Sequence, residues 1–211
     1  IDCVTYVADY NQYNQEILNE NSGLYKFKPD ITFLILDTRH ILGNYFFSWY
    51  SVPHDDRQKI TDTKINEIEN ICNTFTEHSD STLVVTSLQI PNYSPYGIDD
   101  SHVTQSLKQA ILEINTKLFE WNKQYKLLTY DFNQFVRRYG ENNIFNYKQF
   151  FSGDIKISTE YIPKFVDELM RYVYAITGMT KKCIVLDLDN TLWGGVIGED
   201  GFDNIKLGDN P

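Results

Sequence analysis

Short, continuous apolar runs alternate along most of the chain with stretches that have helical periodicity. The clearest run is Ile31–Leu36, and such runs are typical of strands covered on both faces, as in a parallel sheet. The pattern predicts strands at three further places, together with a shorter β-prone run near the start of the chain: Thr82–Leu88, Leu127–Tyr130, Cys183–Leu188 and Cys3–Ala8.

The stretches between these runs carry apolar residues three and four positions apart, which predicts amphipathic helices. The predicted helices are Asp9–Gly23, with Asp9 as a possible N-cap, then Thr63–Phe75, His102–Asn122 and Ser158–Ile176. Repeated alternation of strand and helix predicts an α/β fold, with a doubly wound, mostly parallel sheet flanked by helices.

A short break at Thr177–Thr180 separates two parts of the chain. Gly178 lies where the last long helix should end, just before a new strand. We therefore predict one domain over residues 1–180 and the start of a second over residues 181–211. The chain does not begin with Met and extends only briefly into the second domain, so we expect it to be a piece of a longer protein.

Composition removes several classes of function. The net charge of −10 argues against a nucleic-acid surface, which needs clustered Lys and Arg, and it fits anionic membranes poorly. No run approaches the ~18 apolar residues of a membrane span, and no signal-peptide pattern opens the chain. The three cysteines have no zinc or disulfide spacing. We expect a soluble, cytoplasmic protein that binds neither nucleic acid nor membranes.

The candidate chemistry lies at the end of the last predicted strand. Asp187 and Asp189 are two residues apart, so both carboxylates leave an extended strand on the same side. Two such carboxylates repel one another unless a cation lies between them, and Mg²⁺ prefers hard oxygen ligands of this kind. For a bare Asp-x-Asp pair, the alternative is two strand-end residues that face solvent.

The string CIVLDLDNTL resembles the first motif of the haloacid-dehalogenase (HAD) superfamily of phosphoryl-transfer enzymes. The resemblance implies that Asp187 is the nucleophile and that Asp189 is the general acid/base. It also implies that Mg²⁺ is held by the Asp187 carboxylate and the Asp189 backbone carbonyl, and that Thr191 orders the loop.

The residues that follow this string point to one branch of the superfamily. LDLDNTLWGGVIGEDG is similar to the FkbH-like branch, subfamily IIIC. Its Asp200-Gly201 pair predicts the turn of a flap hairpin. Trp193 is either a packing residue at the base of the flap or a substrate contact, and Gly194 and Gly195 serve backbone conformation.

The resemblance implies an activity for the longer protein. FkbH-like enzymes remove phosphate from a three-carbon acyl phosphate, 1,3-bisphosphoglycerate, and pass the glyceryl group to an acyl carrier protein. A plain HAD phosphomonoesterase acting on a small phosphorylated metabolite is the first alternative. A non-catalytic module that docks the carrier protein is the second. HAD catalysis also needs later motifs, so we predict that these 211 residues alone have no phosphatase activity.

In FkbH-like proteins the HAD domain follows a domain similar to SGNH/GDSL hydrolases. Lys28–Leu36 resembles the segment that leads into the Gly-x-Asn-Asp block of those hydrolases, but Asp37–His40 stands in the place of that block. Asp154–Ile157 occupies the place of Asp-x-x-His, with Ile157 at the His position. Without that base a Ser nucleophile is not activated. We therefore predict that this domain has no esterase activity and serves in docking, substrate positioning or scaffolding.

Three smaller interpretations concern the same domain. We expect Asp37 and Arg39 to form a structural ion pair across the strand end. His40, which follows a strand, lies either at the surface or in a cleft. The aromatic loop Tyr93–Tyr96 forms either the lip of a binding site or ordinary packing.

Overall fold

The computed structural model describes residues 3–123, 126–181 and 183–208. Contacts divide the chain into two compact units, Ile1–Val173 and Tyr174–Pro211, which are described separately below. The division falls within helix α10 (Ile162–Ile176), a few residues before the predicted break at Thr177–Thr180.

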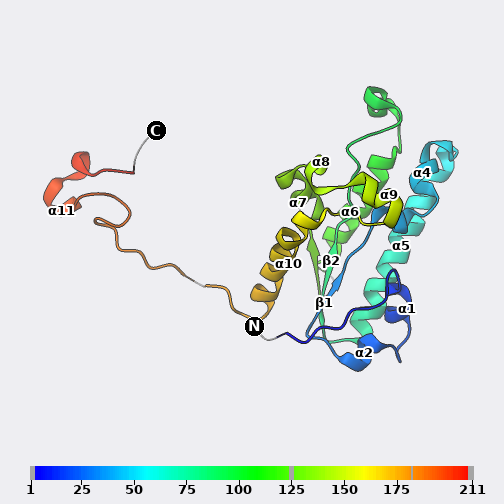
Figure 1. Ribbon diagram of the computed structural model, residues 1–211, viewed down its shortest axis with the longest axis horizontal. Helices are drawn as coiled ribbons and strands as arrows, with labels where there is room; N and C mark the ends of the chain where they lie inside the picture. The colour runs from blue at the N-terminus through cyan, green and yellow to red at the C-terminus, as the bar shows by residue number, and fades with distance from the viewer. Residues whose placement is uncertain (1–2, 124–125, 182, 209–211) are drawn as a thin grey trace. The chain divides into compact units, whose positions relative to one another are not determined.

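The first unit is built on a parallel sheet of three strands in the order β1-β2-β3 (Figure 1). The strands are β1 (Ile31–Leu34), β2 (Thr82–Thr86) and β3 (Leu127–Tyr130). Three of the predicted strands, those at Ile31–Leu36, Thr82–Leu88 and Leu127–Tyr130, are confirmed, the first two in shorter form, and they pair in parallel. The described strands follow chain order, however, without the reversal of direction that characterises a doubly wound sheet.

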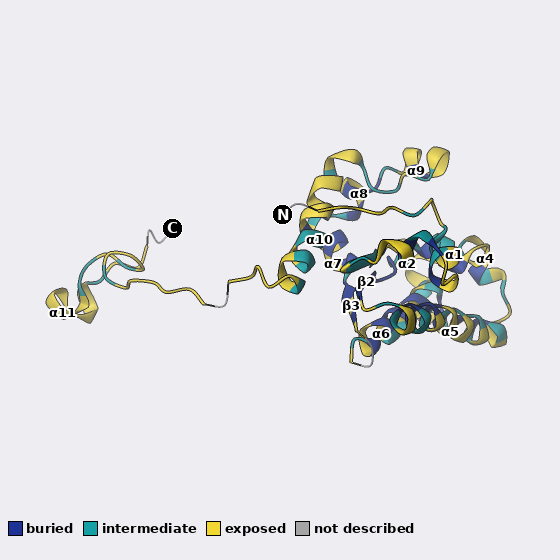
Figure 2. Ribbon diagram, turned by 90° about the horizontal axis from the view of Figure 1, so that it is seen from below, coloured by how far each residue is buried: buried dark blue, intermediate teal, exposed yellow. Residues whose placement is uncertain are grey.

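One face of the sheet is covered by the helices that connect the strands. These are α5 (His54–His78) and α6 (Leu107–Trp121), with α1 (Tyr13–Leu18) packed on α5 (Figure 2). Both crossovers step in the same direction along the sheet, and right-handed crossovers then place both helices on the same face. The buried core between them contains Leu34, Ile68, Cys72, Phe75, Leu83, Val85, Ile111, Ile114 and Leu118.

Two of these helices have different bounds from those predicted. α6 begins at Leu107 because Ser106 caps it, accepting a hydrogen bond from the backbone of Gln109 while the Gln109 side chain accepts from the backbone of Ser106. Of the residues expected to open that helix, His102 ends a 3₁₀ helix, η2 (Gly97–His102), and residues 103–106 form a turn. α5 starts nine residues before the predicted Thr63 (63 − 54), through a polar stretch without helical apolar spacing.

The second face carries an aromatic cluster under α7 (Phe132–Tyr139) and α10. The ring of Phe165 lies 5.6 Å from Phe132, 5.5 Å from Phe135 and 5.7 Å from Tyr130. Burial of this α10 face against the sheet confirms the inward orientation that its spacing predicts for Phe165. The shorter elements nearby are α8 (Glu141–Ile144), α9 (Tyr147–Gly153) and η3 (Thr159–Tyr161).

The start of the chain departs from the prediction. Cys3–Ala8 is extended but pairs with no strand in the described part of the chain, and the single helix expected over Asp9–Gly23 is divided into α1 and α2 (Gly23–Phe27). The break falls at Asn19–Ser22, whose short polar side chains compete with helical hydrogen bonds. After β1 come α3 (Thr38–Leu42), α4 (Tyr45–Ser48) and η1 (Trp49–Ser51).

The second unit consists of turns and short helical segments, α11 (Ile197–Asp200) and η4 (Phe202–Asn204). The predicted strand Cys183–Leu188 is not formed in its described residues, where Ile184 is 79% and Val185 90% exposed. A strand exists only through hydrogen bonds to a neighbour, and no described segment pairs with this one. None of the helices in the described ranges combines the length and apolar content needed to cross a membrane.

Candidate functional site

Polar side chains of the first unit gather where β1 ends. Asp37 follows the strand and caps α3, because its Oδ1 accepts hydrogen bonds from the backbone N–H groups of Arg39 at 2.9 Å and His40 at 3.3 Å. The cap fixes the direction in which α3 leaves the sheet. It thereby places Arg39 and His40 at the carboxyl edge, where ligands bind in open α/β sheets.

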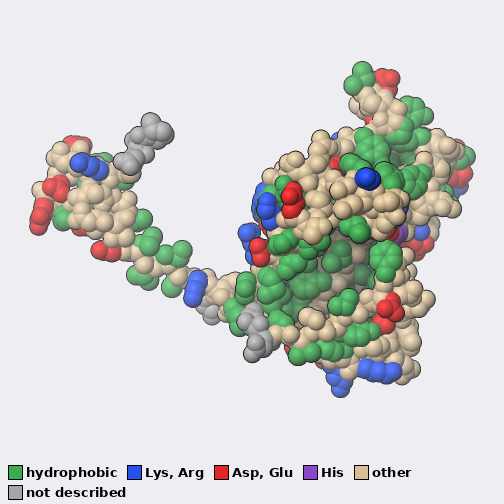
Figure 3. Space-filling model, in the orientation of Figure 1, with side chains coloured by type: hydrophobic (Ala, Val, Ile, Leu, Met, Phe, Trp, Pro, Cys, Tyr) green, Lys and Arg blue, Asp and Glu red, His purple; other side chains and the backbone are tan. Residues whose placement is uncertain are grey.

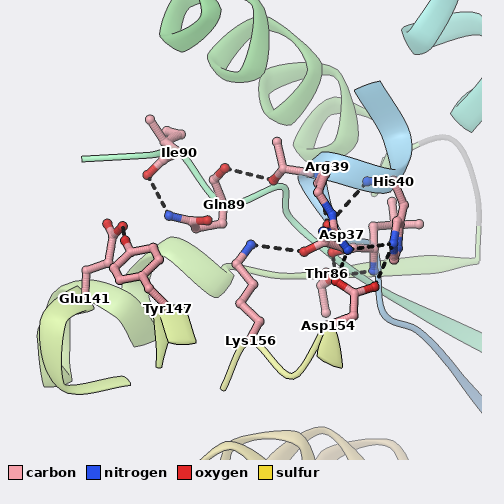
Figure 4. A network of polar contacts seen from close by, with 12 residues as sticks. Asp37, Arg39, His40, Thr86, Gln89, Ile90, Glu141, Tyr147, Asp154 and Lys156 are labelled. Carbon is pink, nitrogen blue, oxygen red and sulfur yellow. Dashed lines mark hydrogen bonds and ion pairs between the residues drawn. The ribbon is translucent and has the colours of Figure 1, made fainter. Parts of the chain in front are cut away.

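The segment that ends α9 and follows it, Asp154–Lys156, contacts these residues. Nζ of Lys156 lies 3.0 Å from Oδ2 of Asp37, and the Arg39 guanidinium pairs with the Asp154 carboxylate (Figure 4). Asp154 ends α9 in the left-handed conformation, with φ of 59°. The predicted Asp37–Arg39 ion pair is therefore wrong, because each residue pairs instead across to the Asp154–Lys156 segment.

His40 joins the same cluster. Its Nε2 lies 3.1 Å from Oδ2 of Asp154 and 3.3 Å from the hydroxyl of Tyr10, which donates a hydrogen bond to Asp154. The His40 side chain is 24% exposed, so it is half-buried rather than a free surface residue. The neighbouring carboxylate and hydroxyl fix the orientation of the ring. Ile157 supplies no base, as its sequence position indicates, but an imidazole reaches Asp154 from elsewhere.

Burial and charge act in opposite directions on Asp37. Burial alone would raise the pKa of its carboxyl group. The charge and hydrogen bond of Lys156, together with His40, outweigh burial, so the pKa lies below the usual 3.8. Asp37 therefore stays ionised at neutral pH and holds the two segments together.

Two buried hydrogen bonds fix the strand ends beneath this cluster. Thr38 donates its hydroxyl proton to the backbone carbonyl of Gln89 at 2.8 Å, and the backbone N–H of Leu36 donates to Oγ1 of Thr86 at 2.8 Å. These bonds tie the loop after β1 to the loop after β2. The polar cluster is consequently set on a rigid edge of the sheet.

A cleft of about 1080 Å³ is lined in part by residues 90–95, which follow Gln89 in the chain. Tyr93 lines it, whereas Tyr96 packs its ring on Tyr50 with 4.8 Å between centroids. The aromatic loop therefore supplies both a lip and packing, which are the two roles that its sequence left open. Other lining residues are Phe46, Phe47, Ser94, Pro95, Asp100, Leu107, Lys108, Leu112, Asn133 and Arg137.

Glu141 forms part of the cleft wall and is only 9% exposed. Its Oε1 accepts a hydrogen bond from the hydroxyl of Tyr147 at 2.6 Å (Figure 4). Burial first, and then this bond and the negative charge of Glu141, raise the pKa of Tyr147 well above its usual value. Tyr147 is accordingly a permanent hydrogen-bond donor at this wall.

In the second unit, the two aspartates of the predicted site differ in their surroundings. Asp187 is exposed, and among the described residues its Oδ1 accepts only from the adjacent backbone N–H of Leu188, at 3.0 Å. Asp189 is held within a loop, since its Oδ1 accepts from Nε1 of Trp193 at 3.0 Å and from the backbone N–H of Ile197 at 3.2 Å. Trp193 thus contacts the predicted acid/base directly, a role that its sequence did not indicate.

The residues after Asp189 form a closed loop rather than a hairpin with a tight turn. Gly194 and Lys206 exchange two backbone hydrogen bonds, each of 2.8 Å, but the helical segment α11 lies between them, with Asp200 at its end. Gly195 has φ of +106°, and a Cβ there would lie 2.9 Å from Oδ2 of Asp200. A glycine is therefore required at 195 by both conformation and space. Thr191 is exposed, with its backbone N–H 3.3 Å from the carbonyl of Leu188.

The donor chemistry of this loop fits a magnesium ion. Asp187 and Asp189 offer carboxylate and carbonyl oxygens, the hard ligands that Mg²⁺ takes together with several waters. Within the described ranges, no group of three or more acidic, His or Cys side chains is gathered at one point.

Comparison with known proteins places the chain in a family. The sequence profile described as "FkbH, N-terminal domain" matches residues 1–174. The crystal structure of the N-terminal part of the protein BF1531 from Bacteroides fragilis, which contains a phosphatase domain and is complexed with Mg, is similar with a TM-score of 0.75 and 26% identity. The similarity covers 97% of this chain and 52% of that one, so this chain spans about half the length of that structure. Curated proteins gave no match.

Proposed function

This chain belongs to the FkbH N-terminal domain family, and we propose that its protein is an FkbH-like enzyme that uses Mg²⁺ in HAD-type phosphoryl transfer. Its substrate is a three-carbon acyl phosphate that resembles 1,3-bisphosphoglycerate, and its product is a glyceryl group on the thiol of an acyl carrier protein. In this proposal residues 1–180 are the hydrolase-like domain and residues 181–211 open the HAD domain.

The observation that carries the proposal is the string LDLDNTLWGGVIGEDG, which begins at Leu186, shortly after the matched domain ends at residue 174. A similar structure from Bacteroides fragilis contains a phosphatase domain and Mg, and it aligns with 97% of this chain. The order of the two parts in this sequence therefore agrees with a phosphatase domain that follows an FkbH N-terminal domain.

Asp187 and Asp189 divide the phosphoryl-transfer chemistry. The exposed Asp187 carboxylate attacks the phosphorus of the phosphate ester, forming an aspartyl-phosphate as the bond to the substrate oxygen breaks. That oxygen takes a proton from Asp189, which later accepts one from the water that releases phosphate. Mg²⁺ held by these two residues would neutralise the charge on the phosphoryl oxygens.

Transfer of the acyl group is a separate step. The carrier thiolate forms a bond to the acyl carbon, the bond from that carbon to the phosphate oxygen breaks, and the phosphate group leaves as inorganic phosphate. The thioester that results retains the glyceryl group. This step uses the thiol of the carrier, so the exposed Cys183 takes no part in it.

The test uses the longer protein. Incubation with 1,3-bisphosphoglycerate, Mg²⁺ and candidate carrier proteins should add a glyceryl mass to one carrier, with phosphate released, and Asp187→Asn should abolish release of the ester phosphate. Release of phosphate without an adduct on any carrier would support a phosphomonoesterase instead. No release, with retained binding of a carrier protein, would support a docking module.

A further inference from the structure

Glu141 is a buried carboxylate without a cation beside it. It lines the cleft, is only 9% exposed, and its Oε1 accepts a hydrogen bond from the hydroxyl of Tyr147 at 2.6 Å. No ion pair in the described ranges includes Glu141. Tyr147 therefore supplies a hydrogen bond but no positive charge. Because a carboxylate taken out of water without a cation costs free energy, this wall of the cleft favours a ligand with a positively charged group.

Aromatic side chains line the same cleft. Tyr93 is 56% exposed, and partial burial, followed by the negative charge of Glu141, raises the pKa of its phenol. The two residues are thus near enough to interact. Phe46 and Phe47 also line the cleft, with 5.0 Å between their ring centroids, and Phe47 is 66% exposed. The face of an aromatic ring attracts a cation, so rings and carboxylate favour the same kind of ligand.

The loop after β2 adds a second carboxylate to the cleft. Residues 91–106 project from the carboxyl edge of the sheet (Figure 1) and contain no Lys or Arg. In Figure 3 this projection carries acidic and hydrophobic side chains. Asp100 lines the cleft there, and its Oδ1 accepts hydrogen bonds from the hydroxyls of Tyr50 and Ser94, each at 2.6 Å. Both donors are neutral, so the negative charge of Asp100 adds to that of Glu141.

Two basic side chains line the cleft as well, but they do not balance these carboxylates. Arg137 is 69% exposed and already pairs with Asp131, at 3.2 Å. Lys108 is exposed and joins no ion pair within the described ranges. One flexible ammonium group in solvent therefore stands against two carboxylates, in a chain whose net charge is −10. The resulting field attracts cations and repels anions.

We propose that this cleft binds a small organic ammonium compound, whose cationic group contacts Glu141 and the ring of Tyr93 and whose apolar arm packs on Phe46 and Phe47. The cleft volume of about 1080 Å³ is ample for such a ligand. A neutral sugar also uses aromatic rings and carboxylates, but it leaves the charge of Glu141 unpaired. The inference is independent of the proposed phosphoryl transfer, which uses residues of the second unit.

The first experiment compares two ligands of the same size on the longer protein. 2-Phenylethylammonium carries the positive charge, and 2-phenylethanol has a neutral hydroxyl group in its place. Ligand-observed NMR titrations at pH 7 should give a Kd at least about tenfold lower for the ammonium compound. Equal affinities, or no binding of the ammonium compound, would overturn the proposal. Tighter binding of glucose than of the ammonium compound would assign the cleft to sugars and overturn it as well.

Substitutions then locate the binding site. Glu141→Gln keeps an acceptor for Tyr147 but removes the charge, so it should weaken binding of the ammonium compound at least about tenfold and leave binding of the alcohol unchanged. Glu77→Gln is the matched control, because it removes one charge from an exposed position near the end of α5, outside the cleft.

Tyr93→Leu keeps apolar bulk at an exposed position and removes the ring, so it should weaken binding of the ammonium compound about threefold. This variant decides the question if Glu141→Gln does not fold. Unchanged affinity in Tyr93→Leu, or an equal loss in Glu141→Gln and Glu77→Gln, would overturn the proposal.

Discussion

Nε2 of His40 lies 3.1 Å from Oδ2 of Asp154, although the two residues are 114 positions apart in the chain. α3 brings the imidazole to the carboxyl edge of the sheet, and the left-handed end of α9 brings the carboxylate. The Asp-x-x-His spacing of hydrolases is absent, yet an imidazole still reaches the aspartate from another segment. The His40–Asp154 pair is therefore the part of this domain in which esterase activity should be tested.

We predict no esterase activity from this domain. In the described structure the contacts of the His40 ring are with Tyr10, Arg39 and Asp154, and none of these is an activated Ser or Cys nucleophile. Fluorogenic acetate esters and acetylated sugars should therefore not be hydrolysed above background. Turnover that disappears in Asp154→Asn would contradict this prediction.

Asp37→Asn should lower the free energy of unfolding by about 1–2 kcal/mol at pH 7. Asn still caps α3, so the loss reports the ion pair with Lys156. The folded-state pKa of Asp37 lies below its unfolded value. The stabilisation is therefore complete at neutral pH and is lost as the pH falls below about 4. Urea denaturation between pH 3 and 7, read by fluorescence, measures the effect.

Asp131→Asn is the matched control for that measurement. Asp131 also caps a helix, through the backbone N–H of Gln134 at 3.1 Å, but its partner Arg137 is 69% exposed. Exposed ion pairs contribute little, so this variant should stay within about 0.5 kcal/mol of the parent at every pH. If Asp131→Asn lowered the free energy of unfolding as much as Asp37→Asn does, the partial burial of Lys156 would not be the reason for the stabilisation.

Trp193→Phe should lower kcat of the longer protein about tenfold with little change in KM. The substitution keeps an aromatic ring but removes the N–H group that holds Oδ1 of Asp189. The measurement is Mg²⁺-dependent phosphate release, with Phe202→Leu, on an exposed residue of the same unit, as the control. An unchanged kcat would indicate that Trp193 serves only in packing.

The 211-residue chain by itself should release no phosphate from acyl phosphates or phosphomonoesters. Asp187 is exposed, and its described contacts include no cationic group that would stabilise the charge developing on phosphorus. A malachite-green assay with and without Mg²⁺ measures this. Mg²⁺-dependent turnover that is lost in Asp187→Asn would contradict it.

Two thiols of the native chain should react quickly with a disulfide reagent at pH 8, and the third only on unfolding. Cys3 and Cys183 are exposed, whereas burial raises the pKa of the Cys72 thiol to about 12. A rate for Cys72 at least about a hundredfold lower than for the others is expected. Rapid reaction of all three would indicate that α5 opens in the native state.

Much of the fold follows from periodicity. Leu83 and Val85 lie in a continuous apolar run and are fully buried, and Ile111 and Ile114 keep the helical spacing that predicts their inward face. These residues are specified by their near neighbours in sequence. The spacing of Asp187 and Asp189 is also local, but their role as a shared site stays a prediction.

Contacts between residues far apart in the chain could not be predicted from the sequence. Nothing near Lys156 indicates that it pairs with Asp37, 119 positions away, or that the imidazole beside Asp154 is that of His40. The predicted strand at Cys183–Leu188 likewise has the right composition, but a strand also needs a neighbour to pair with. Pairing across the fold is set by the sheet and its connections, which local patterns do not encode.

The order of the sheet has a consequence for how the chain reaches its native state. Ile31 pairs with Thr82 and Leu83 with Leu127, so neighbouring strands are separated by 51 residues (82 − 31) and 44 residues (127 − 83). No two of the described strands meet through a hairpin, and each ladder between them forms only after a long loop has closed, which slows folding. We therefore expect the helices to form early and the sheet to form late, leaving the apolar run of β1 exposed to aggregation during synthesis.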